Sequence, residues 1–159
     1  MSDGLLAIYL NDHLSGATGG LELFRRAAAT QRDSPAGPAL QHLAEEVAQD
    51  RASLEALMAL LGVTRRSYKV WGGWALEKVA RVKPNGHLLT RSPLSDLVEL
   101  EGLVLGVQGK AAGFRALRAA ALPELDDAEL DRLISRAERQ GEVLEELRLA
   151  AAARALQPA

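Results

Sequence analysis

The stretch LLAIYLNDHLSGATGGLELFRRAAA, residues 5–29, decides the fold class of this chain. Placed on a helix at about 100° per residue, its apolar side chains form one broad stripe. The members of this stripe are Leu6, Leu10, Ala17, Leu21, Phe24 and Ala28. Polar side chains fall opposite, namely Asn11, Ser15, Thr18, Glu22, Arg25 and Arg26. His13 lies near the centre of the apolar stripe, so we expect its ring to face the helices that cover this one.

The composition favours a helical protein with one core. Of 159 residues, 48% are hydrophobic but only 4% are aromatic, so leucine, alanine and valine must form the core. Such a core suits helix packing better than a sheet. The chain has no cysteine, which excludes disulfides and thiolate chemistry. The alanine- and arginine-rich composition is typical of a GC-rich bacterial genome.

The charge and hydropathy pattern bears on the environment of the protein. The net charge is −2, and Asn11, Asp12 and His13 interrupt the apolar run near the start. A signal peptide is therefore not expected, and no apolar run reaches the roughly 18 residues of a membrane span. These features predict a soluble, cytoplasmic protein without stable membrane insertion.

Helical periodicity continues through most of the remaining chain. We expect helices at about residues 4–30, 38–61, 64–83, 93–120 and 126–156, in a single domain over residues 1–159. Pro38 suits the first turn of the second helix, and Gly62 is a natural stop at its end. Ser92 and Pro93 predict an N-cap and first turn for the helix that follows.

The helix expected over residues 93–120 is apolar almost all round, which predicts that other elements cover most of its sides. Four glycines recur along it: Gly102, Gly106, Gly109 and Gly113. Each costs roughly 1 kcal/mol relative to alanine inside a helix. Because a favourable contact must offset this cost, we expect the backbone of another helix to approach this stripe closely.

The lengths of the connections indicate the topology. Short connections join the first and second long helices and the third and fourth, so each pair should be an antiparallel hairpin. Some 30 residues separate the two hairpins, enough to travel the length of a bundle. This arrangement resembles the ferritin-like four-helix bundle, with a long crossover that contains the shorter helix. The motifs YLNDHL at residues 9–14 and SPL at 92–94 are similar to small actinobacterial helical proteins of uncharacterised function. A simple up-down five-helix bundle is the structural alternative.

The ferritin-like resemblance implies a possible di-iron centre, made by one Glu from each of two helices and a Glu-x-x-His from each of the other two. The sequence contains no Glu-x-x-His. His42 falls on the polar side of its helix, and His87 falls in the crossover. We therefore expect no di-iron cofactor.

Each long helix nevertheless offers one polar residue to the expected interior: His13, Asp50, Glu101 and Gln140. We expect His13 and Asp50 to lie within one helical turn of each other and to form a hydrogen bond. One interpretation is a buried hydrogen-bond network that sets the helix register, in which Arg51 or Lys110 could pair with the acids. The other is a small-ligand or single-metal site, with His13, Asp50 and Glu101 as candidate ligands.

The expected crossover helix is basic. Residues 64–92 hold seven cationic side chains and one acid, a net charge of +6. The candidate anion-binding residues are Arg65, Arg66, Lys69, Lys78, Arg81 and Lys83. One interpretation is an amphipathic connector that docks Tyr68, Trp71 and Val79 onto the bundle. The other is a surface for nucleic acid, acidic lipid or an acidic protein.

These patterns favour a non-enzymatic role, since no nucleophile motif or phosphate loop occurs. The leading hypothesis is a ferritin-like bundle that acts through helix-face association with itself or a partner, as a homo-oligomer. The alternatives are a degenerate metal-binding ferritin-like protein, for which an oxidase is one candidate activity, and an anion- or nucleic-acid-binding module that uses the crossover.

Overall fold

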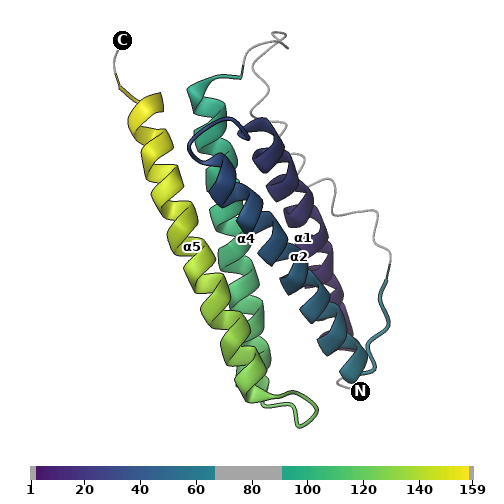
Figure 1. Cartoon of the computed structure of the whole chain (residues 1–159). Coiled ribbons are helices and arrows are strands. Elements are labelled where there is room, and N and C mark those ends of the chain that lie inside the picture. The colour runs from purple at the N-terminus through teal and green to yellow at the C-terminus, as the bar shows by residue number, and fades with distance from the viewer. Residues whose placement is uncertain (1–2, 67–90, 158–159) are drawn as a thin grey trace.

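The protein is all-α. The computed structural model describes residues 3–66 and 91–157, and within these residues it contains helices and no strand. The helices are α1 (Asp3–Thr30), α2 (Gly37–Leu60), α4 (Pro93–Ala120) and α5 (Asp127–Ala155), as Figure 1 shows. Each of their ends lies within one residue of the bounds expected from the sequence. Of the expected helix at 64–83, Thr64 to Arg66 are not helical, and residues 67–83 lie outside the described residues.

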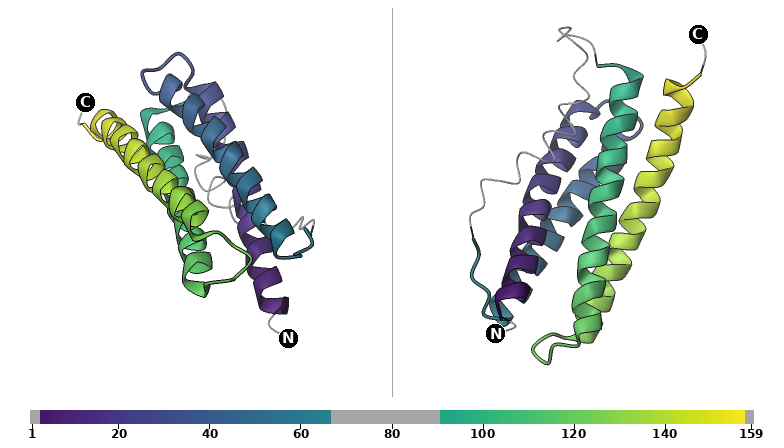
Figure 2. Two further views of the ribbon diagram at one scale, coloured as in Figure 1. Left: turned by 60° about the horizontal axis from the view of Figure 1, so that its bottom comes forward. Right: turned by 180° about the vertical axis from the view of Figure 1, so that it is seen from behind.

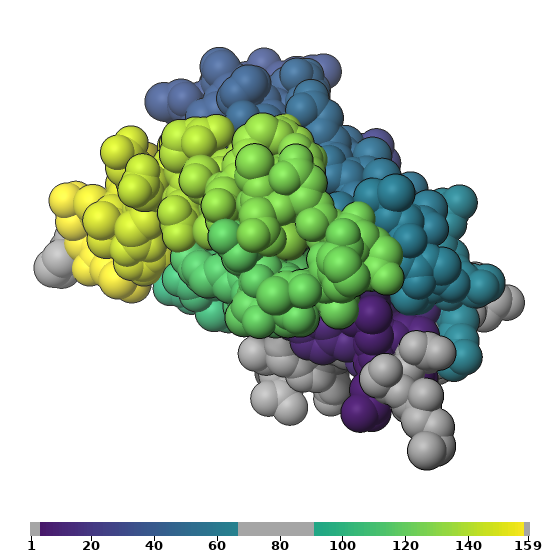
Figure 3. Space-filling model, turned by 90° about the horizontal axis from the view of Figure 1, so that it is seen from below, coloured from purple at the N-terminus to yellow at the C-terminus, as the bar shows by residue number. Residues whose placement is uncertain are grey.

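The four helices form a bundle of two antiparallel hairpins. α1 packs along α2, α4 packs along α5, and α1 also contacts α4, whereas α2 and α5 meet less closely. α2 and α4 run in the same direction, so the end of α2 and the start of α4 lie at opposite ends of the bundle (Figures 1 and 2). Viewed from below, the start of α1, the end of α2 and the α4–α5 connection gather at one end (Figure 3).

Local interactions explain where the helices begin and end. Ser92 is the N-cap of α4, and its hydroxyl accepts a hydrogen bond from Ser95 N, as the sequence predicts. The Asp126 carboxylate caps α5 in the same way by accepting from Ala128 N. At the end of α2, Gly62 has φ +64°, a left-handed conformation that glycine adopts without a Cβ penalty. This turn lets Val63 N donate to Met58 O at 2.9 Å.

The interior contains two apolar clusters along the bundle axis. The first lies toward the start of α1 and includes Leu10, Leu14, Leu54, Met58, Phe114 and Leu133. The second lies toward the other end and includes Leu21, Phe24, Leu40, Leu100, Leu103 and Leu144. Between them, α2, α4 and α5 each contribute polar side chains. No helix within the described ranges is long and apolar enough to cross a membrane.

Candidate functional site

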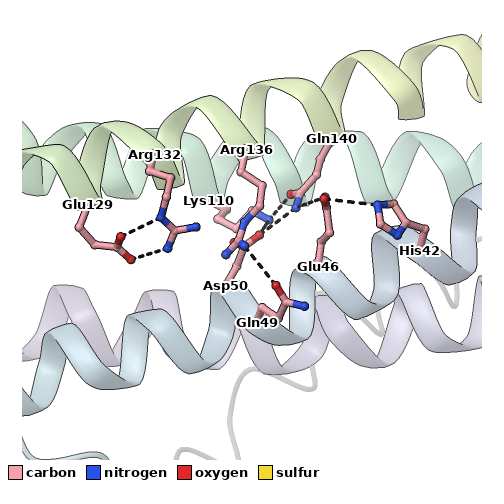
Figure 4. Close-up of polar contacts among 9 residues, drawn as sticks. All are labelled: His42, Glu46, Gln49, Asp50, Lys110, Glu129, Arg132, Arg136 and Gln140. Carbon is pink, nitrogen blue, oxygen red and sulfur yellow. Dashed lines mark hydrogen bonds and ion pairs between the residues drawn. The ribbon is translucent and has the colours of Figure 1, made fainter.

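The polar layer between the two apolar clusters centres on the Asp50 carboxylate. Asp50 belongs to α2 and is 1% exposed. Lys110 Nζ, from α4, donates to Asp50 Oδ2. From α5, Arg136 Nε donates to Oδ1 at 2.6 Å and Gln140 Nε2 donates to Oδ2 at 3.0 Å (Figure 4). A single buried carboxylate therefore joins three helices.

The same layer extends outward between α2 and α5. Gln140 Nε2 also donates to Glu46 Oε2 at 3.0 Å, and its Oε1 accepts from Lys110. Arg136 Nη1 donates to Gln49 Oε1 at 3.2 Å. Two carboxylates, Asp50 and Glu46, thus balance two cations, Lys110 and Arg136. Such balance matters because an unpaired charge in a buried layer is costly.

Burial disfavours the charged form of Lys110. It lowers the pKa of the Lys110 ammonium below its ordinary value, Asp50 opposes this effect, and the nearby cation Arg136 lowers the pKa further. The ammonium is nevertheless held by the Asp50 carboxylate and the Gln140 amide oxygen. These contacts satisfy the charge that burial would otherwise penalise.

Of the expected polar quartet, the structure brings together Asp50 and Gln140. The expected hydrogen bond between His13 and Asp50 is wrong. The His13 ring lies beside Gly113 of α4, and it is tilted at 59° to the Tyr9 ring with 4.5 Å between the centroids. Both residues point inward, but His13 turns toward α4 whereas Asp50 turns toward the α4–α5 hairpin. A helical wheel gives the inward direction without saying which helix is faced.

Glu101 is also misplaced by the sequence analysis. Its side chain is 48% exposed and lies 3.6 Å from Arg148 of α5. We expected it to border the core at the level of residues 140–143, one to two turns away along α5. Lys110 is the α4 residue at the level of Gln140, and its suggested pairing with an acid is confirmed. Arg51 instead pairs with Glu55 and donates to the Thr18 hydroxyl.

Two residues of structural importance were missed. Arg136 is buried, and its position four residues before Gln140 on the same α5 stripe was the available signal. Asn11 was assigned to the polar side of its helix, yet it is 1% exposed. Its Nδ2 donates to Thr64 O at 3.1 Å and its Oδ1 accepts from Arg66 N at 2.6 Å, so the chain after α2 covers it.

The glycine stripe of α4 corrects another expectation. A Cβ at Gly113 would lie 2.7 Å from His13 Cε1, so this glycine makes the close approach that was predicted, but to a side chain. Gly102, Gly106 and Gly109 are exposed, and a Cβ there would meet nothing within 4 Å among the described residues. Among the described residues, no other helix covers this part of α4.

The candidate anion-binding surface is described only at its start. Arg65 pairs with Glu55 at 2.7 Å, and Arg66 is tied through its backbone to Asn11. Lys69, Lys78, Arg81, Lys83 and His87 lie outside the described residues. His42 is exposed, 3.5 Å from Glu46.

The candidate metal ligands do not form a common site. His13 and Glu101 lie apart from Asp50, whose carboxylate oxygens bind Lys110, Arg136 and Gln140. In the described parts of the chain, no three His, Asp or Glu side chains are grouped so that they could hold a metal ion.

No family model, curated protein or solved structure matches this chain.

Proposed function

We propose that this protein is a non-enzymatic ferritin-like bundle that acts by self-association of a helix face. The observation that carries the proposal is the outward face of α4. Its seven residues are uncharged: Leu94, Val98, Gly102, Leu105, Gly109, Ala112 and Ala116. Leu94 is 52% exposed and Leu105 is 57% exposed. A continuous apolar surface of this kind is typical of a protein interaction site.

The ferritin-like part of the proposal is supported by connectivity. Two antiparallel hairpins in which α2 and α4 run in the same direction are the arrangement of a bundle with one long crossover. Ferritin-like bundles place functional polar groups midway along the core, on facing helices. The polar layer around Asp50 occupies the corresponding place between the two apolar clusters.

The non-enzymatic part is supported by the chemistry of that layer. The Asp50 carboxylate is buried and its oxygens already accept hydrogen bonds from Lys110, Arg136 and Gln140. It is therefore poorly placed to bind a substrate or to exchange a proton with one. A layer of paired charges from three helices is suited to joining the hairpins in one arrangement.

Sedimentation of the full chain over a wide range of concentration tests the proposal. We expect the average mass to rise reversibly above the 17.0 kDa of one chain. Self-association should persist at high salt, because the proposed surface is apolar and salt screens only charge interactions. A mass that stays at one chain up to millimolar concentration would contradict the proposal. Loss of association with added salt would shift the interaction to the charged surfaces.

A further inference from the structure

We draw no further inference here: the strongest candidate, the alanine-lined groove between the end of α1 and the start of α2, carries nothing because its arginines, Arg25 and Arg32, already pair with Glu22 and Asp33, and nothing in the described parts of the chain shows what covers it.

Discussion

The imidazole ring of His13, on α1, lies so close to Gly113, on α4, that a Cβ on the glycine would be 2.7 Å from its Cε1 and 2.8 Å from its Nδ1. A Cβ at position 113 would therefore force the His13 ring to move. The relationship links the two hairpins, since each of these residues belongs to a different one. It also explains why one glycine of the α4 stripe is buried while its neighbours are open.

Gly113→Ala should therefore destabilise the protein, by about 1–2 kcal/mol, because the half-buried His13 ring must move away from the new Cβ. In a His13→Ala background the same change should stabilise by about 1 kcal/mol, since helix propensity then acts alone. Urea unfolding of the four proteins of this double-mutant cycle measures both values. The same sign in both backgrounds would show that His13 and Gly113 are not in contact.

The ionisation of His13 predicts a dependence of stability on pH. Burial lowers the pKa of His13 below 6.5, and Asp12 opposes the shift without reversing it. The unfolded chain consequently binds a proton at a higher pH than the folded chain does. The contribution of neutral His13 to the free energy of unfolding is fully present above about pH 6.5. It is lost as pH falls toward the pKa of His13 in the folded protein.

The comparison of the natural chain with His13→Gln isolates this effect. Both proteins keep His42, His87 and every carboxylate, so the difference between their free energies of unfolding reports position 13. We expect the natural chain to lose stability relative to the variant as pH falls from 7 to 5. Parallel profiles, or a relative gain by the natural chain at low pH, would mean that burial does not dominate at His13.

Substitution of the central carboxylate of the polar layer should destabilise the protein more than substitution of one of its cations. Asp50→Ala leaves Lys110 and Arg136 close together without their shared carboxylate, and should cost about 3–5 kcal/mol. Lys110→Met keeps Asp50 paired with Arg136 and fills a similar volume, so it should cost less than about 2 kcal/mol. Thermal and urea unfolding of both variants check the order. Asp50 would not be the centre of the layer if the lysine variant were the less stable of the two.

The hydrogen bonds of Asn11 hold the chain segment that follows α2, so their loss should loosen that segment. Asn11→Ala removes the hydrogen bonds to Thr64 and Arg66 and should cost about 2 kcal/mol, at about 1 kcal/mol for each bond. Trypsin should then cut after Arg65 and Arg66 several times faster, as followed by mass spectrometry. Ser15→Ala, on the same helix, is the matched control. Equal cleavage rates in both variants would show that Asn11 does not hold this segment.

The fold was largely predictable because its signals are local. Apolar periodicity, Pro93 and the Ser92 cap determine where the helices lie, and each of these features acts within a few residues. The short connections between paired helices also predict the hairpins. Asp50 and Gln140 were identified because they interrupt apolar stripes.

The rest of the candidate site depends on contacts that a single helix does not reveal. His13 and Asp50 both point inward, but the choice of neighbour depends on how each helix is rotated in the bundle. The level of Glu101 along α5 depends on the geometry of the α4–α5 turn. Asn11 is buried by residues more than 50 positions away, which a helical wheel does not include.

The two hairpins contribute charges of opposite sign to the polar layer. Residues 3–66 hold the carboxylates of Asp50 and Glu46, and residues 91–157 hold the cations of Lys110 and Arg136. In the bundle neither hairpin neutralises its own charges in this layer, so the opposite charges add to the apolar contacts that hold the two hairpins together. Two fragments divided between α2 and α4 would therefore be expected to remain poorly folded alone and to regain structure when mixed.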